Sequence, residues 1–274
     1  MKRAVFSLAI SAVLVAPSFA QDTQTQGGEI LSAFYGLDDS RRIRVATLRT
    51  CSGNTGPDGM PVIFSLEVDD STLDADDFKV TTQGGEVGVV NCVTLRPADE
   101  LGEKRTALLI GQYGSADDQP ASVEIVGDLM SLEGDVNFKG ATANVIAFED
   151  GPTLILAEEL PANYWDLGGE GDCPRDGLKN IVRAVWVGGI TKPGGDEIDA
   201  KEMAMYRVTV RSEDGTTQTV TPMAVGDLGD NDNNHDLCLD VTGMPLSVYF
   251  PAGALTDPNE DINPETEIAV IPAE

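Results

Sequence analysis

Short runs in which apolar and polar residues alternate restrict the possible folds of this chain more than any other feature. In residues 62–68, the side chains of Val62, Phe64, Leu66 and Val68 fall on one face of an extended strand. The pattern recurs at residues 206–211, where Tyr206, Val208 and Val210 share a face, and at residues 246–250. A period of two is typical of strands with one buried face, so the sequence predicts β-strands.

Glycine-containing turns separate these runs. Gly84-Gly85 and Asp214-Gly215 stand between strand-like segments, as hairpin turns require residues that tolerate positive φ. We find no convincing amphipathic helix after residue 20, and residues 73–78 and 196–206 have room for a helical turn only. Many short strands with such turns indicate an all-β sandwich or barrel.

The first twenty residues have the pattern of a signal peptide. Lys2 and Arg3 precede an apolar run from residue 4 to residue 16, and Ser18-Phe19-Ala20 supplies small residues at the cleavage positions. The run is short for a membrane span, and no later segment approaches the required length, although a retained anchor is the alternative. We therefore expect a secreted or periplasmic protein without a membrane span in the mature chain.

The chain is strongly acidic. Its formal charge is −28, and removal of residues 1–20 takes away Lys2 and Arg3, which leaves −30. Such a chain repels nucleic acid and anionic membrane surfaces, so neither is expected as a partner. It attracts divalent cations or basic partners instead, although adaptation to salty surroundings also explains an acidic surface.

Two parts of the sequence resemble one another. Residues 61–95 and 183–240 each read as a strand, an acidic loop, an Asp-Ala segment, an aromatic-led strand, a glycine turn, a further strand and a cysteine. Residues 122–140 and 245–265 continue the parallel. The interpretation is a tandem duplication, with domains at 28–155 and 156–274; the alternative is chance similarity between β-rich, Asp-rich segments.

The stretch PVIFSLEVDDSTLDADDFKVTT, at residues 61–82, resembles the bacterial Ig-like domains of S-layer and other exported surface proteins. The resemblance covers mainly residues 61–95. It implies an Ig-like β-sandwich that serves as a spacer, scaffold or binding module, and it implies no chemistry. The second part of the chain departs from the pattern through an insertion before Cys238.

Four cysteines in an exported chain indicate disulfide bonds, with three possible connectivities. Cys51 precedes Phe64 by thirteen residues, as Cys173 precedes Trp186, and both Cys92 and Cys238 follow the hairpin of their repeat. The repeat therefore predicts the pairs Cys51–Cys92 and Cys173–Cys238, each worth about 4 kcal/mol on the loop-entropy view. Buried free thiols are the alternative.

One acidic stretch, GDLGDNDNNHDLCLD at residues 226–240, has the alternation of a calcium loop. Four oxygen-bearing side chains stand two residues apart: Asp230, Asp232, Asn234 and Asp236. However, His235 occupies the position where an EF-hand has glycine, and Val241 the position of its bidentate glutamate. Residues 257–263 show a similar alternation. Each stretch is interpreted as a calcium site or as a solvated acidic turn.

Catalytic patterns are weak in this sequence. His235 is the single histidine, no G-x-S-x-G motif accompanies it, and we expect it in an exposed loop with its pKa raised by neighbouring carboxylates. Two carboxylates alone serve many glycosidases, but the sequence identifies no pair. Tyr164-Trp165 is the better candidate for a sugar platform, whereas Trp186 lies in a strand pattern and is expected in the core.

These observations favour a non-catalytic tandem Ig-like protein, stabilised by calcium, that acts as a scaffold or as a binding and adhesion module for an unidentified protein or glycan. The alternative is a calcium-dependent hydrolase or carbohydrate-binding protein that uses residues 226–240. Convergence of this stretch, His235 and Tyr164-Trp165 on one pocket would favour the alternative, and their dispersal would favour the scaffold.

Overall fold

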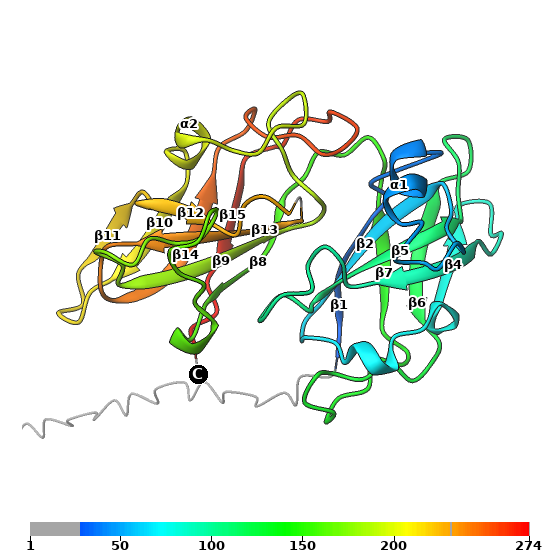
Figure 1. Cartoon of the computed structure of the whole chain (residues 1–274), viewed down its shortest axis with the longest axis horizontal. Coiled ribbons are helices and arrows are strands. Elements are labelled where there is room, and N and C mark those ends of the chain that lie inside the picture. The colour runs from blue at the N-terminus through cyan, green and yellow to red at the C-terminus, as the bar shows by residue number, and fades with distance from the viewer. Residues whose placement is uncertain (1–27, 231, 274) are drawn as a thin grey trace, which may run out of the picture.

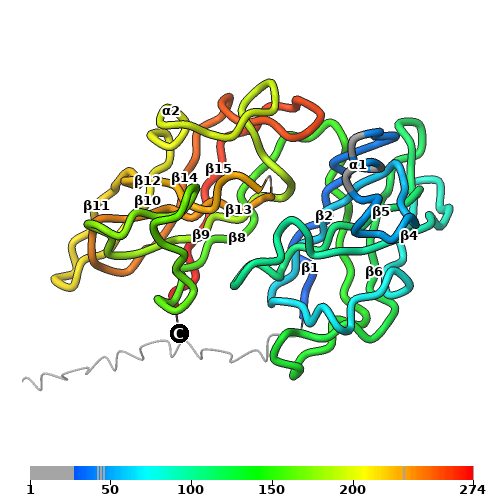
Figure 2. Tube along the Cα trace, in the orientation of Figure 1, coloured from blue at the N-terminus to red at the C-terminus, as the bar shows by residue number. Residues whose placement is uncertain are grey.

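The computed structural model describes residues 28–230 and 232–273, and the predicted signal peptide at residues 1–20 lies outside them. The described chain is all-β, as predicted, and forms two halves that lie side by side (Figure 1). The first half comprises residues 28–148 and the second half residues 154–273, and the Cα trace shows the single connection between them (Figure 2). Among the described residues, no helix has the length and apolar character needed to cross a membrane.

The first half is built on one curled sheet with the strand order β3-β6-β7-β1-β2-β5-β4. Its strands are β1 (Ile30–Phe34), β2 (Asp58–Phe64), β3 (Phe78–Thr82), β4 (Val89–Thr94), β5 (Thr106–Gln112), β6 (Pro120–Ile125) and β7 (Thr142–Ile146). β1 lies between β2, to which it is antiparallel, and β7, to which it is parallel. The outer strands β3 and β4 meet at the predicted glycine turn, where Gly85 has a φ of 87°.

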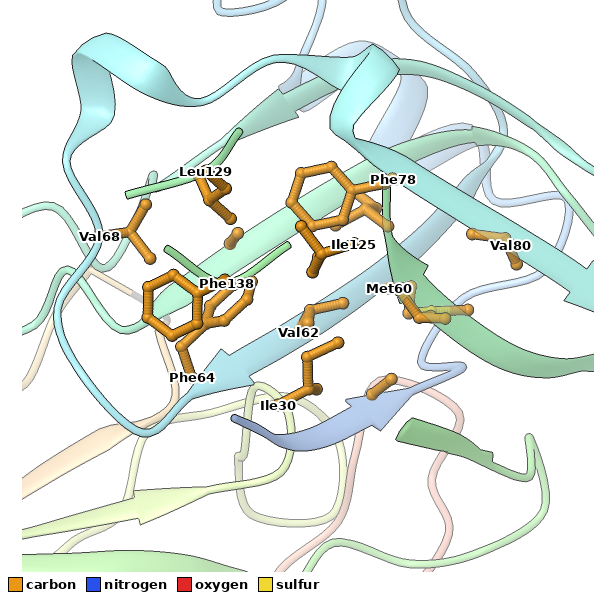
Figure 3. Packing of buried hydrophobic residues seen from close by; sticks show 14 of the residues in the cluster. Ile30, Met60, Val62, Phe64, Val68, Phe78, Val80, Ile125, Leu129 and Phe138 are labelled. Carbon is orange, nitrogen blue, oxygen red and sulfur yellow. The ribbon is translucent and has the colours of Figure 1, made fainter. Parts of the chain in front are cut away.

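Aromatic and branched side chains fill the space inside the curled sheet (Figure 3). The ring centroid of Phe64 lies 4.8 Å from that of Phe138 and 6.4 Å from that of Phe78, both in edge-to-face contact. Val62, Phe64 and Val68 are fully buried on the predicted face. Leu66 is partly buried against the same core.

The second half is a sandwich of two four-stranded sheets, with the orders β12-β13-β9-β8 and β11-β10-β14-β15. Its strands are β8 (Leu154–Glu159), β9 (Asn180–Trp186), β10 (Arg207–Arg211), β11 (Thr217–Val220), β12 (Ala224–Gly226), β13 (Asn234–Leu239), β14 (Met244–Phe250) and β15 (Thr266–Ala269). Tyr206, Val208 and Val210 point into the core with Trp186, as predicted.

Helices are few and short. The predicted helical turns are the 3₁₀ helix η2 (Ala75–Asp77) and the α-helix α2 (Ala200–Met203). Two further 3₁₀ helices are η1 (Asp70–Thr72) and η3 (Ala162–Tyr164). The sequence reading missed α1 (Arg41–Ala46), which begins after Ser40, whose hydroxyl accepts a hydrogen bond from Ile43 N. A serine before a short basic run was the available signal for this cap.

Both predicted cysteine pairs are disulfide bonds in the structure. Cys51 follows α1 and is bonded to Cys92 on β4, while Cys173 precedes β9 and is bonded to Cys238 on β13. The Cα atoms are 5.7 Å apart in each pair. The bonds therefore tie a loop to a strand within each half.

The two halves differ in strand order, since one has a single seven-stranded sheet and the other two four-stranded sheets. The core of the first half extends along the sequence to Phe148, and the core of the second half begins at Leu154. The change falls close to the predicted boundary at Gly151-Pro152. The predicted domain limit at residue 155 lies within β8. The tandem duplication and the Ig-like assignment stay predictions.

Candidate functional site

The junction between the halves contains a small apolar contact. Ile63 of β2, on the face opposite to Val62 and Phe64, packs against Leu156 of β8 and Val185 of β9. Beside it, Arg105 forms a two-pronged ion pair with Glu158, with Nε–Oε1 and Nη2–Oε2 distances of 3.2 and 2.8 Å. The two halves are thus joined by packing and charge as well as by the chain.

Arg183 lies at the centre of a second, more buried ionic contact. It sits directly across from Asp236 in the β9–β13 register, and its Nε and Nη2 donate to the two carboxylate oxygens at 2.8 and 2.9 Å. Nη2 is also 3.0 Å from Oε1 of Glu103, and Nη1 donates to the Leu101 carbonyl at 3.3 Å. Arg183 therefore holds a loop of the first half onto a sheet of the second.

His235 is not in an exposed loop, and this prediction was wrong. Residues 234–239 form β13, an inner strand between β9 and β12, and all six residues are buried. Tyr206 Oη accepts a hydrogen bond from Trp186 Nε1 at 3.0 Å and is hydrogen-bonded to His235 Nδ1 at 2.6 Å. Burial lowers the pKa of His235 to about 3, the opposite of the expected direction, because the core disfavours the imidazolium.

Five carboxylates meet beside Arg183, and we call them the junction cluster: Glu100, Glu103, Asp227, Asp230 and Asp232. The first two belong to the loop between β4 and β5 of the first half, and the other three to the loop between β12 and β13. Ligand oxygens of Glu103, Asp230 and Asp232 lie within 4.8 Å of one another, as do those of Glu100, Glu103 and Asp227. Glu103 is common to both groups.

Burial dominates the electrostatics of the junction cluster. It raises the pKa of Glu103 to about 8, with Asp232 and Asp236 adding to the rise and Arg183 opposing it. Burial and then the Glu103 charge raise the pKa of Asp227 to about 9. The pKa of Asp232 is also well above its ordinary value because of burial. Full ionisation of the cluster beside one guanidinium is therefore unfavourable without further positive charge.

Several oxygens of the cluster are buried without a hydrogen-bond donor among the described residues: both oxygens of Glu103, Oδ2 of Asp227 and Oδ2 of Asp230. Glu103 Oε1 is close enough to Arg183 for an ion pair, but the geometry is not that of a hydrogen bond. Asp232 differs, because Oδ1 accepts from Asn234 N at 2.7 Å and Oδ2 accepts from the Asn234 side chain.

The structure divides the four predicted calcium ligands into two groups. Asp230 and Asp232 lie in the junction cluster, whereas Asn234 donates its amide to Asp232, and Asp236 pairs with Arg183. The division arises because β13 begins at Asn234, where the tight turn needed for a single loop site ends.

Sequence reasoning missed Glu100, Glu103 and Asp227. Asp227 belongs to the quoted acidic stretch and has a positive φ of 63°, which the sequence pattern did not reveal. No sequence signal connects Glu100 and Glu103 to residues more than a hundred positions later.

The second acidic stretch, residues 257–263, folds around its own side chains. Asp257 is buried, and its Oδ1 accepts from Asn259 N and Asp261 N, both at 2.9 Å. Asn263 Oδ1 likewise accepts from the backbone of residues 254 and 255. At both ends of this stretch, a side-chain oxygen that the alternation offered to an ion is thus bound to backbone N–H groups.

A cleft of about 660 Å³ lies between the halves, next to the junction cluster. Its first-half wall combines apolar residues such as Leu37, Ile43 and Leu95 with Glu100, and its second-half wall includes Asp230 and Asp232.

The other features that the hydrolase alternative would need do not line this cleft. Trp165 packs near the Cys173–Cys238 bond and donates Nε1–H to the Leu160 carbonyl at 2.9 Å. Tyr164 lies against Gly102. His235 is in the core of the second half. Of the three features, only the acidic stretch reaches the cleft.

Comparisons with known proteins give no family for this chain. No protein-family model matches the sequence, and no curated protein matches it. Solved structures with some likeness include the N-terminal part of the bacterial S-layer protein SbsC, with 14% identity, a TM-score of 0.29 and coverage of 89% of this chain and 44% of that one. Domains 1–6 of the surface layer protein SbsC give 11% identity, a TM-score of 0.31 and coverage of 91% and 55%. The chain thus spans about half of each, and likeness at these TM-scores assigns neither family nor function.

Proposed function

We propose that this protein is an exported, non-catalytic scaffold whose two β-rich halves form one rigid unit. The observation that carries the proposal is the junction, where Arg105–Glu158, Arg183–Glu103 and the Ile63 contact join the halves at separate points. Buried ion pairs and apolar contact resist hinge motion more strongly than a linker alone. The predicted signal peptide and the two disulfides support an oxidising location.

The environment of the histidine supports a non-catalytic role. A general acid or base must reach substrate and change protonation near the working pH. His235 is enclosed by the core, its Nδ1 is engaged by Tyr206, and its pKa is about 3. It therefore serves the packing of the second half.

The partner we propose is an exposed protein or glycan outside the cytoplasm. The acidic surface disfavours nucleic acid and anionic membranes, and favours a protein partner with exposed lysine or arginine side chains.

Distances between the halves, measured by double electron–electron resonance, test the scaffold proposal. Spin labels at two exposed positions, Glu133→Cys in the first half and Thr217→Cys in the second, should give one narrow distance distribution in about 5 mM CaCl₂. The control is a doubly labelled pair at exposed positions within the second half, Glu213→Cys with Ala252→Cys. A distribution between the halves much broader than the control would contradict a rigid scaffold.

The cleft favours a second candidate, a calcium-dependent carbohydrate-binding or carbohydrate-active protein. Its volume of about 660 Å³ suits a small ligand, and the carboxylates on both of its walls resemble the polar groups that orient such ligands. A glycan array with and without Ca²⁺, followed by turnover assays on the bound glycans, tests this function. Binding without turnover would support a module, and turnover would overturn the non-catalytic proposal.

A further inference from the structure

We propose that the junction cluster is a divalent-cation site that prefers Ca²⁺ to Mg²⁺, in which Glu103 of the first half and Asp230 and Asp232 of the second bind one ion together. This site differs from a loop site formed by alternate residues of 230–236, because a ligand comes from a distant loop. It stands independently of the scaffold role, since it rests on local geometry alone.

The placement of the oxygens is the first observation. One ligand oxygen from each of Glu103, Asp230 and Asp232 lies within 4.8 Å of the others, a spacing that a single ion can bridge. A Ca²⁺ ion binds oxygens at about 2.3–2.6 Å, so two ligands on opposite sides of it are about 5 Å apart. The three carboxylates therefore surround a position of suitable size.

The state of Glu103 is the second and independent observation. Its side chain is 1% exposed, and neither oxygen accepts a hydrogen bond from any described residue. A buried carboxylate without donors is costly, and such groups in native proteins are paired or coordinate metals. Ligand oxygens of Asp230 and Asp232 lie within 4.8 Å of that of Glu103, and a bound cation would allow all three carboxylates to be ionised together at neutral pH.

Arg183 does not fill this role alone. Its Nε and Nη2 both donate to Asp236, and its Nη1 donates to the Leu101 carbonyl. Its Nη2 lies 3.0 Å from Oε1 of Glu103. Both oxygens of Glu103, Oδ2 of Asp227 and Oδ2 of Asp230 are buried without a hydrogen-bond donor among the described residues, so one guanidinium leaves room for a second positive charge.

The donor set favours Ca²⁺ over Mg²⁺. Three carboxylates supply charged oxygen ligands, water or carbonyl oxygens can fill the remaining positions, and Ca²⁺ accepts six to eight oxygens in flexible geometry. Mg²⁺ demands an octahedron and keeps several waters. Glu100 and Asp227 complete the negative surroundings beside Glu103.

Isothermal titration calorimetry and melting curves on the full mature chain test the site. We expect one Ca²⁺ per chain with a Kd of about 10⁻⁴–10⁻³ M, the range of extracellular modules. At about ten times this Kd, Ca²⁺ should raise the melting temperature by roughly 3–6 °C. Mg²⁺ at equal ionic strength should raise it much less.

Glu103→Gln is the decisive variant. It removes one charge from the first half while preserving side-chain size, so it should abolish the Ca²⁺ response, which is measured as the difference between Ca²⁺ and chelator for the same variant because loss of the Arg183 ion pair lowers its stability in both. Asp230→Asn, which retains the oxygen that accepts from Asp232 N, is the second variant and serves if Glu103→Gln does not fold. Loss of the response in Glu103→Gln supports the site, whereas loss in Asp230→Asn with a full response in Glu103→Gln would indicate a site within residues 230–236 and overturn the proposal.

The matched control comes from another acidic group in the same half. Asp38, Asp39 and Asp58 also lie close together, but Asp58 accepts from Tyr113 N at 2.8 Å and from Asp39 N and Gln112. Asp38→Asn should keep the full Ca²⁺ response. Equal shifts from Ca²⁺ and Mg²⁺, or a response that survives in Glu103→Gln and Asp230→Asn, would overturn the proposal.

Discussion

Two acidic stretches of the second half, residues 226–236 and 257–263, share an alternation of Asp and Asn, but their side-chain oxygens differ in their hydrogen-bond partners. In the later stretch, Asp257 and Asn263 turn their oxygens onto backbone amides of their own loop. In the earlier one, Asp227 and Asp230 keep buried oxygens without such donors, close to Glu103 of the other half.

The difference shows that alternation of Asp and Asn does not distinguish a turn from an ion site. What distinguishes them is the supply of backbone N–H groups around the oxygens. Residues 257–263 form a closed turn that presents several N–H groups to one carboxylate. In residues 226–236, Asp230 Oδ1 and Asp232 Oδ1 also accept from backbone N–H groups, but Oδ2 of Asp227 and Oδ2 of Asp230 are buried without a donor among the described residues.

The largest expected effect is at Arg183. Arg183→Met should lower the free energy of unfolding by about 3–5 kcal/mol, because Asp236 and Glu103 would stay buried without their cation. Urea unfolding measures the change. Arg211→Met, at an exposed end of β10, is the control and should change stability by less than about 0.5 kcal/mol. Equal losses in both variants would mean that the pair has no special weight.

Asp257→Ala should cost less, about 1–3 kcal/mol, because two partly buried backbone N–H groups lose their acceptor. Asp257→Asn keeps one acceptor oxygen and should lose less than half as much. Chemical denaturation is measured in Ca²⁺ and in chelator, because only the stretch at residues 226–236 should respond to the ion. A loss at Asp257 that depends on Ca²⁺ would contradict the purely backbone role of this loop.

The pH dependence of stability tests whether His235, on β13, is enclosed in the core. The folded protein keeps the imidazole neutral down to about pH 3, whereas the unfolded chain binds a proton below about pH 6.5. The unfolded state therefore binds more protons in this window, and stability falls as the pH falls. Between pH 7.5 and pH 5.5 the loss from this group should be about 1–2 kcal/mol.

His235→Asn keeps a polar side chain beside Tyr206 but has no group that titrates in this range. The variant should therefore lack the pH-dependent loss of stability that His235 causes, even if its overall stability differs from that of the wild type. The measurement is the difference in unfolding free energy between variant and wild type at the two pH values. A difference that does not change with pH would show that His235 titrates normally and is not enclosed.

The smallest expected effect is at Asn259, the residue of the later stretch that reaches the other half. Its Nδ2 donates to the Gly36 carbonyl at 2.7 Å. Asn259→Ala should lower stability by about 0.5–1 kcal/mol, as for one partly exposed hydrogen bond. A loss comparable with that of Arg183→Met would place the main attachment of the halves here, and calorimetric unfolding would detect it.

The sequence predicted local features well because they depend on neighbouring residues. Val62 and Phe64, Tyr206 and Val208, and the turn at Gly85 follow from a period of two and from positive φ. The cysteine pairs followed from matched spacing.

The junction cluster was beyond this kind of reasoning, because Glu103 meets Asp230 and Asp232 only when two distant loops are brought together. His235 was misplaced for a related reason. Its polar neighbours indicate a loop, yet β13 is covered on one face by the core and on the other by Arg183 and the first half.

The parallel pairing of β1 with β7 has a consequence for the order of folding during synthesis. β1 occupies an inner position of its sheet, but its neighbour β7 ends only at Ile146. At about 5–20 residues per second, the ribosome needs roughly 6–22 s to produce the chain between these strands. For that interval one edge of β1 has no partner strand, and an unpaired edge invites pairing with other chains. A chaperone that holds the nascent chain should therefore matter most for the first half.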